Sequence, residues 1–441
     1  GLISWLAGQP NVAASVKRAA GIKGDLDHFG ATNFLVGLLT ILRDSGYSGL
    51  VMVLDEVETL QRMRTDTREK GLNALRQWID EIDAGLDPLI GWWGDRRRVR
   101  RGMILLALPC LALGMLALMH PPALHAAGWL ALSLAITYLG YSLASIGLQA
   151  WGAELGRDSR ERTLLTASRE GFGLLGVVAA AVLPALLAAD AALGLSRLAW
   201  VCVGLLAALA GLTLLATPRP VLAPPAVPEA TASPLAPLRD AAFRRLLAVY
   251  VSSGIAAALP ATLVLFFVAD VLQAEAWGGV FLALYFVAGA AGLTFWVKLA
   301  RRIGRVRAWI AGMLLSSLAF VWAYGLGAGD VGAFALVCLV SGLALGTDLA
   351  LPAALLADLA EREQGSARAG GYFGWWNLVT KLNLALAAGI ALPLLAWLGY
   401  RPDGPEGTAA LAAVYCLLPV GFKLTSAALA WRWRHTLEES P

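Results

Sequence analysis

Ten long apolar segments follow one another along the chain from residue 102 onward. They cover roughly 102–119, 126–150, 171–189, 198–217, 246–269, 276–297, 308–327, 331–357, 371–399 and 408–431. A helix needs about 20 mostly apolar residues to cross about 30 Å of hydrocarbon, because it rises about 1.5 Å per residue. The pattern therefore predicts ten membrane-spanning helices. A transmembrane β-barrel would instead show shorter segments with alternating apolar and polar residues.

The polar pattern is different in the opening part of the chain. Residues 1–86 contain 9 Lys/Arg and 11 Asp/Glu, whereas the remaining 355 residues contain 26 and 20. The change falls within "QWIDEIDAGLDPLIGWWGDRRRVRR" (77–101). The whole chain is 58% hydrophobic with a mean hydropathy of +0.66, which is typical of a membrane protein. The first segment is therefore expected to be a soluble fragment, and the rest to lie in lipid.

Lysine and arginine in the loops predict the orientation of the spans. Basic loops alternate with loops nearly free of Lys and Arg; the basic ones are "RRRVRR" (96–101), "GRDSRERTLLTASRE" (156–170), 239–245, "KLARRIGRVR" (298–307) and "WRWRH" (431–435). Basic loops stay on the cytoplasmic side of a membrane. We expect a multi-pass protein of the bacterial inner membrane with both termini in the cytoplasm.

A proline-rich stretch divides the spans into two groups. Seven prolines lie between Pro218 and Pro237, which is typical of a semi-rigid spacer. "GWWGDRRRVRRGMIL" (91–105) and "KLARRIGRVRAWIAGM" (298–313) form a weak repeat, each a short basic loop between two apolar segments. Such duplication is a feature of transporters, whose substrate path runs between the halves. The expected domains are a fragment at 1–82, a first bundle at 83–217, a linker at 218–243 and a second bundle at 244–441.

Four stretches after residue 83 resemble one transporter family. They are "DAGLDPLIGWWGDRRR" (83–98), "GAELGRDSRERTLLTASREGFGLLG" (152–176), "LPAALLADLAEREQG" (351–365) and "GYFGWWNLVTKLNLALAAG" (371–389). Together they are similar to the major facilitator superfamily, and in detail to its glycoside–pentoside–hexuronide:cation symporter branch. The resemblance covers about 83–441. It implies an all-α fold of two six-helix bundles, of which helix 1 and half of helix 2 are replaced here, leaving four spans plus six.

The opening segment resembles a different protein. "GYSGLVMVLDEVETLQRMRTDTREKGLNALRQWIDEIDAG" (46–85) is similar to the P-loop ATP-binding protein of BREX phage-defence systems, and residues 1–45 continue the likeness. "VMVLDE" has the form of a Walker B strand, in which Asp55 would hold Mg²⁺ and Glu56 would polarise water. No GxxxxGK[ST] sequence occurs in the chain, so ATP hydrolysis is not expected. We expect a small α/β fragment that carries a degenerate Walker B.

The charged residues within apolar segments are candidates for transport. An ionisable residue inside the membrane is costly and is a functional candidate by default, and Lys381 interrupts an otherwise uncharged run. The family resemblance implies that Asp83 and Asp87 bind the coupling cation beside Lys381. The alternative is that Asp83 ends a soluble helix and Asp87 caps a turn before Pro88. We predict that Lys381 faces the space between the bundles and that Asp87 is the nearest carboxylate of the first bundle.

The same resemblance implies further site residues. Gly91, Asp95 and Arg96 match the loop that latches the bundles together on the cytoplasmic side, although a basic loop also serves as a simple membrane anchor. The substrate-binding candidates are Arg169, Ser145, Trp375 and Asp348. Ser145 stands where the family has an acidic sugar-binding residue. The alternatives are an interfacial arginine at 169, aromatic packing at 375 and an ion pair within the bundle at 348.

The leading interpretation is a permease that moves a small organic solute, with sugar-like molecules as one class, together with H⁺ or Na⁺. Alternating access would rock one bundle against the other. The alternative is a non-transporting chimera of a truncated transporter and a nucleotide-binding fragment. The four cysteines lie singly in apolar runs and the four histidines are scattered, so no metal site is expected. We expect no enzymatic activity, no cofactor and no nucleic-acid partner; the expected partners are membrane lipids, the solute and the cation.

Overall fold

The computed structural model describes residues 85–97, 99–122, 126–218, 233–362, 369–401 and 407–438. All of them belong to one compact unit, Leu60–Pro441. The described residues form helices and connecting turns, with no strand among them. The α/β fragment expected at 1–82, with Asp55 and Glu56, lies outside the described residues. Asp83 does as well.

Ten helices of the described part are long and apolar enough to cross a membrane, which confirms the predicted number. They are α5 (Arg100–Met119), α6 (Ala126–Leu155), α7 (Ser159–Leu187), α8 (Ala191–Ala216), α9 (Ala241–Phe266), α10 (Gly278–Ile303), α11 (Arg305–Ala323), α12 (Val331–Arg362), α13 (Ala369–Trp397) and α14 (Thr408–Arg432). A further helix occupies 85–97, and α9 continues into a π-helical turn, η4 (Phe267–Val271). The remaining elements are the 3₁₀ turns η3 (Ala236–Arg239) and η5 (Glu275–Trp277) and the terminal helix α15 (Arg434–Glu438).

Aspartates before the helices fix where several spans begin. Asp158 accepts a hydrogen bond from the backbone N–H of Glu161 at 2.7 Å, so α7 begins at Ser159 rather than near residue 171. Asp190 caps α8 in the same way, and Asp240 caps α9. A side-chain oxygen at this position satisfies one of the N–H groups that the first turn of a helix leaves free. The polar first turns of the spans are therefore helical although they add nothing to the apolar pattern.

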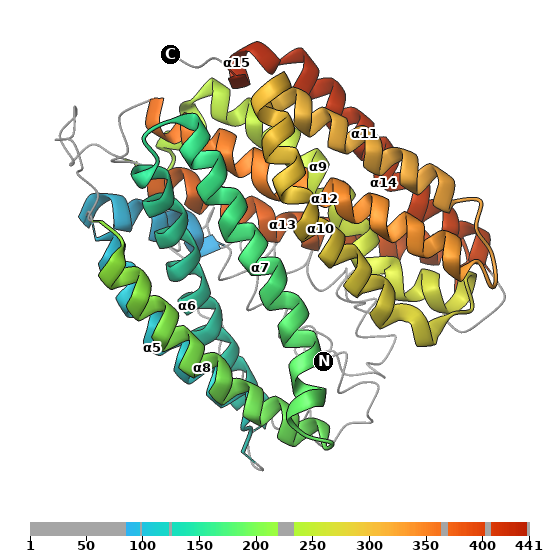
Figure 1. Cartoon of the computed structure of the whole chain (residues 1–441), viewed down its shortest axis with the longest axis horizontal. Coiled ribbons are helices and arrows are strands. Elements are labelled where there is room, and N and C mark those ends of the chain that lie inside the picture. The colour runs from blue at the N-terminus through green and yellow to red at the C-terminus, as the bar shows by residue number, and fades with distance from the viewer. Residues whose placement is uncertain are drawn as a thin grey trace, which may run out of the picture. The chain divides into compact units, whose positions relative to one another are not determined.

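The spans form two groups that meet along a few helices (Figure 1). The second group, α9 to α14, packs closely through α9 with α13 and α14 and through α12 with α10 and α11. The first group comprises α5 to α8 with the helix at 85–97. Between the groups, α7 packs against α10 and α12, and α13 packs against α6. The observed arrangement is the expected pair of four-span and six-span bundles.

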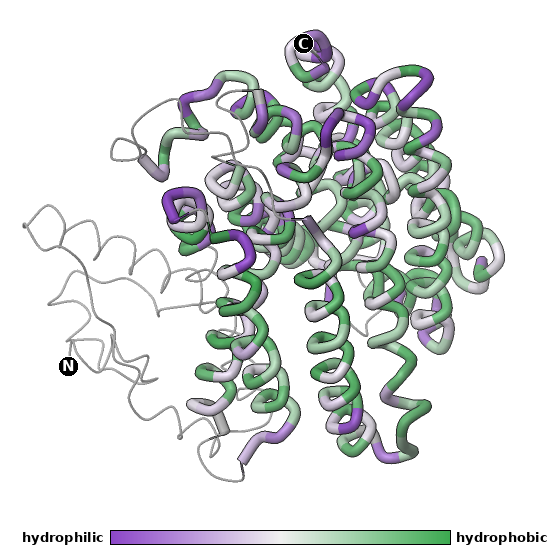
Figure 2. The backbone as a smooth tube through the Cα atoms, turned by 60° about the vertical axis from the view of Figure 1, so that its left-hand side comes forward, coloured by the Kyte–Doolittle hydropathy of each residue, from purple (hydrophilic) through white to green (hydrophobic). Residues whose placement is uncertain are grey.

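Hydrophobic residues predominate along the length of the spans, and hydrophilic residues gather toward the helix ends (Figure 2). Only 6% of the residues in the most apolar 18-residue stretch of α7 are buried, and only 11% of those in α8. The corresponding share in α12 is 56%. The first bundle offers fewer neighbouring helices, so its side chains remain exposed to the surroundings. In a membrane these exposed apolar side chains contact lipid tails instead of protein.

Candidate functional site

A buried charge pair lies where the two bundles meet. Asp87 belongs to the helix at 85–97, and its side chain is fully buried. The ammonium of Lys381 on α13 lies 3.0 Å from Oδ2 of Asp87 and donates a hydrogen bond to the hydroxyl of Ser142 on α6 at 2.9 Å. The predicted proximity of Lys381 and Asp87 is therefore observed. Pairing offsets part of the cost of removing both charges from water.

A row of uncharged polar side chains extends from this pair along the contact between α6 and α13. Ser145 accepts hydrogen bonds from the amide nitrogens of Gln149 at 2.8 Å and of Asn377 at 3.2 Å. Ser142, Ser145 and Gln149 lie at intervals of three and four residues, so they share one face of α6. Asn377 precedes Lys381 by one turn on α13. The two helices thus present hydroxyl and amide groups to each other across the bundle interface.

Asp95 makes the first of two contacts between the bundles. Its carboxylate accepts hydrogen bonds from the backbone N–H groups of Gly370 at 2.8 Å and Gly371 at 2.6 Å, at the start of α13. These N–H groups belong to the first helical turn, which favours a negative charge. Arg100 pairs with Asp95 and also with Glu154, 2.7 Å from its Nε. Burial raises the pKa of Asp95, and the charge of Arg100 and the two backbone N–H groups oppose that shift.

A second cross-bundle contact centres on Asp358 of α12. From the first bundle, Arg162 donates to Oδ1 of Asp358 at 3.0 Å and Ser159 donates to Oδ2 at 2.6 Å. Arg305 of the second bundle pairs with the same carboxylate. Arg100, Ser159 and Arg305 mark one end of the spans, which we call the basic end. Both cross-bundle contacts lie there, and together they hold the bundles in contact at this end.

Of the residues expected at the latch, Gly91 and Asp95 make contacts between the bundles, whereas Arg96 does not pair with Asp95. A side chain on Gly91 would overlap the carbonyl oxygen of Gly370, so the glycine allows the close approach of the two helices. The basic partner of Asp95 is Arg100 rather than Arg96. Arg96 is exposed, and its guanidinium lies 5.4 Å from the ring centre of Trp92. Arg100 is one turn further along and begins α5, which turns it back toward Asp95.

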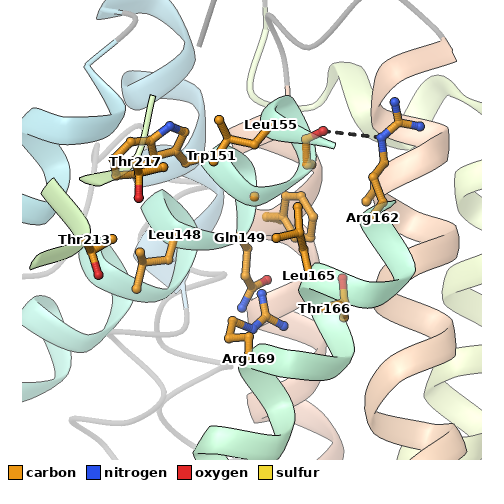
Figure 3. A pocket seen from close by; sticks show the side chains of 14 residues that line it. Leu148, Gln149, Trp151, Leu155, Arg162, Leu165, Thr166, Arg169, Thr213 and Thr217 are labelled. Atoms are coloured by element: carbon orange, nitrogen blue, oxygen red, sulfur yellow. Dashed lines mark hydrogen bonds between the residues drawn. The ribbon is translucent and has the colours of Figure 1, made fainter. Parts of the chain in front are cut away.

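Arg169 lines a cavity of about 190 Å³ that is formed mostly by the first bundle, with Ala357 and Phe373 of the second bundle also in its lining (Figure 3). It pairs with Glu170 at 2.5 Å, and its side chain points into the same cavity as Gln149. Arg162, at another wall of this cavity, donates from Nε to the carbonyl of Ala153. Arg169 thus shares a cavity with Gln149, which belongs to the polar row, and its side chain is one-third exposed.

Two predicted substrate residues make their contacts elsewhere. The indole of Trp375 donates to the carbonyl of Pro234 at 2.9 Å, which holds the end of the linker against α13. Asp348 accepts from Lys423 at 2.5 Å, from Trp309 at 2.9 Å and from Ser253 at 3.0 Å. All of these partners belong to the second bundle. Asp348 thus joins helices within one bundle, the arrangement that the sequence left open as an alternative.

Several residues of these contacts were not anticipated. Arg100, Glu154, Arg162 and Asp358 all lie at the margins of apolar runs, where a charged residue is ordinary and its partner is not visible in the sequence. The polar row of Ser142, Gln149 and Asn377 had a faint signal in its helical spacing. What selects these residues is the packing of helices that lie apart in the chain: Ser145 and Asn377 are 232 positions apart, and Arg162 and Asp358 are 196. Arg100 and Glu154 are 54 positions apart.

Comparison with known proteins agrees with this geometry. Residues 79–436 match the family of MFS/sugar transport proteins, and residues 1–93 match the BREX system ATP-binding protein BrxC/D. The two matches overlap over 79–93, the region in which the sequence changes character. Fold and site together define a multi-pass membrane transporter. The chain belongs to the MFS/sugar transport protein family.

Solved structures share the fold at low sequence identity. A bacterial homologue of the iron transporter ferroportin in an outward-facing state is 18% identical, with a TM-score of 0.62 over 82% of this chain and 90% of that one. The MFS transporter FucP in its outward conformation is 14% identical, with a TM-score of 0.62 over 88% and 96%. Another FucP structure, from E. coli, has a TM-score of 0.55 at 14% identity over 80% and 94%. Among curated proteins, none is significantly similar to this chain.

Proposed function

We propose that the chain is a cation-coupled symporter of the bacterial inner membrane that moves a small organic solute by alternating access. The observation that carries this proposal is the buried contact of Asp87, Lys381 and Ser142 at the bundle interface. An ion pair at such a place is expensive and faces the path that a solute would take between the bundles.

The geometry suggests how a cation would act. The ammonium of Lys381 occupies the position beside Asp87 that a free cation would take, at 3.0 Å from its carboxylate. H⁺ or Na⁺ arriving at Asp87 weakens this pair, because either one neutralises the charge that holds the ammonium. Lys381 then moves away from Asp87, and the contact between the helix at 85–97 and α13 loosens. Cation binding and bundle movement are coupled through this exchange.

The polar row supplies groups for the solute. Ser145, Gln149 and Asn377 offer donors and acceptors without a net charge, which suits a neutral hydroxylated molecule. The similar E. coli transporter is a fucose:proton symporter, so monosaccharides are the first solutes to test. A serine at 145 in place of a carboxylate favours fewer hydrogen bonds to the solute, and hence weaker binding of a sugar.

The contacts at the basic end agree with one state of the transport cycle. Asp95 and Asp358 both bridge the bundles there. With the basic end toward the cytoplasm, the protein is closed on the cytoplasmic side. The similar structures of the ferroportin homologue and of FucP are likewise in outward-facing conformations.

Uptake by proteoliposomes tests the proposal. The purified full chain would be supplied with radiolabelled monosaccharides, fucose first, under an imposed H⁺ or Na⁺ gradient. We expect gradient-stimulated uptake that is lost in Asp87→Asn and Lys381→Ala and kept in Arg307→Gln, which removes an exposed charge at the basic end. Gradient-independent uptake in every variant would refute cation coupling. The absence of uptake of any solute by the intact chain would favour the non-transporting chimera.

A further inference from the structure

A long groove runs between α7 of the first bundle and α10 of the second. Two hollows, of about 360 and 380 Å³, lie along the contact of these helices. Leu175 and Ala290 line both hollows, so the two adjoin. Their lining extends from Leu164 to Leu183 on α7, a length of about 28 Å at 1.5 Å per residue. This is about the thickness of the hydrocarbon layer of a membrane.

The groove opens away from the interior of the first bundle. Thr166 lines the cavity of about 190 Å³ that also contains Arg169 and Gln149. Leu175, which lines the groove, follows Thr166 nine residues later. Nine residues are two and a half helical turns, so the two side chains lie on opposite faces of α7. Phe172 is 76% exposed, Leu175 58% and Val287 54%. Apolar side chains exposed to this degree on membrane spans contact lipid tails.

Two positively charged side chains lie at one end of the groove. Lys298 and Arg301 line it at the basic end of α10, three residues apart and therefore on one face of the helix. Both are exposed, and in the described part of the chain neither is paired with a carboxylate. Ser168 and Thr294 line the same hollow and add hydroxyl groups near the cations. The groove is thus cationic and hydroxylated at one end and apolar beyond it.

We propose that this groove binds an anionic phospholipid. The phosphate would lie against Lys298 and Arg301, and one acyl chain would run along α7 and α10 past Leu175. Basic pockets between membrane helices recognise anionic head groups, and a zwitterionic head group gains less there because its own cation is repelled. The walls of the groove come from different bundles, so a bound lipid touches both and stabilises the present arrangement.

Lipid titration of the purified full chain in detergent tests this site. The chain would be titrated with phosphatidylglycerol, phosphatidylcholine and inorganic phosphate, with thermal unfolding and native mass spectrometry as readouts. We expect phosphatidylglycerol to raise the unfolding temperature saturably, at concentrations about tenfold or more below those of phosphatidylcholine. Inorganic phosphate should have no effect, because it lacks the acyl chain. Equal effects of the two lipids, or stabilisation by phosphate alone, would overturn the proposal.

Matched variants locate the site. Lys298→Gln with Arg301→Gln should abolish the preference for phosphatidylglycerol. Arg302→Gln with Arg307→Gln removes the same amount of charge outside the groove, and this variant should retain the preference. Val287→Trp, at an exposed position, should fill the apolar part and weaken both lipids. If the two double variants lose the preference equally, the effect is one of general charge and the site is refuted. Native mass spectrometry of Val287→Trp decides the matter should the first double variant not fold, since unchanged lipid retention there would refute it.

Discussion

Gly91 and Gly370 bring the helix at 85–97 and α13 into backbone contact at the basic end. A methyl group on Gly91 would overlap the carbonyl oxygen of Gly370, and one on Gly370 would lie 2.6 Å from the carbonyl oxygen of Gly91. The contact places the N–H groups of Gly370 and Gly371 within reach of Asp95. The absence of side chains here is therefore a condition for the cross-bundle hydrogen bonds.

Gly91→Ala should separate the two helices and weaken the contact made by Asp95. Alanine is normally the better residue inside a helix, by about 0.5–1 kcal/mol. Gly85→Ala, on the same helix with nothing within 4 Å of the added methyl group, should therefore leave the unfolding temperature unchanged or raise it. Thermal unfolding in detergent compares the two variants. A Gly91→Ala protein as stable as Gly85→Ala would show that the helices are not in tight contact.

Asp358→Asn should release the second cross-bundle contact. The amide keeps the shape of the side chain but no longer attracts Arg162 and Arg305, two charged partners on either side of the interface. The basic end should open more often as a result. A cysteine at Gln149 reports this opening through its rate of modification by a charged thiol reagent, in a protein from which the half-exposed Cys110 and Cys202 have been removed.

The control for this experiment is Glu275→Gln, which removes an exposed carboxylate in η5, beyond the far ends of the spans. We expect faster modification in Asp358→Asn than in Glu275→Gln or in the parent protein. Equal rates in all three would mean that Asp358 does not hold the bundles together in the state that admits the reagent.

The ten spans were predictable because each is set by its own composition, and the bilayer demands the same length of every one. Partners of charged residues were predictable only where a charge stood alone in an apolar run. Lys381 is such a case: the cost of leaving it unpaired indicated that it has a partner, and the family resemblance indicated Asp87, which it contacts. Arg100 lies in the run RRRVRR (96–101), in which any of several arginines could have been the ion-pair partner of Asp95. Only the direction in which α5 leaves the loop selects it.

Lys381→Met should be more harmful to stability than the double variant Asp87→Asn with Lys381→Met. Removing one partner of a buried pair leaves the other charge buried without that counter-ion and costs about 3–5 kcal/mol, whereas replacing both removes both charges. The pair is suited to this comparison because the side chain of Asp87 is fully buried and that of Lys381 is mostly buried, with 21% exposed. Chemical unfolding in detergent gives the free energies. Additive effects of the two substitutions would show that the pair contributes no coupling to the folded state.

Ser145→Ala should impair solute binding without removing cation coupling. It deletes the acceptor shared by Gln149 and Asn377 and leaves Asp87 and Lys381 in place. We expect the KM for the solute to rise several-fold, in line with the loss of a hydrogen bond of about 1 kcal/mol, while the ratio of uptake with and without a cation gradient stays constant. Thr425→Ala is the control, because it removes a hydroxyl that donates to the carbonyl of Gly421 in its own helix. A lost gradient response in Ser145→Ala would place the cation site further along the polar row.

Asp348 and Lys423 allow the roles of the two buried pairs to be separated. Lys423 is 4% exposed and lies 2.5 Å from Asp348, and both also bond to Ser253, so the pair joins α9, α12 and α14 within one bundle. Lys423→Met alone should cost about 3–5 kcal/mol, and Asp348→Asn with Lys423→Met should cost less. The double variant should still show gradient-stimulated uptake, because nothing at Asp87 or Lys381 has changed. Loss of that stimulation in a double variant that inserts and folds normally would assign cation coupling to the second bundle instead.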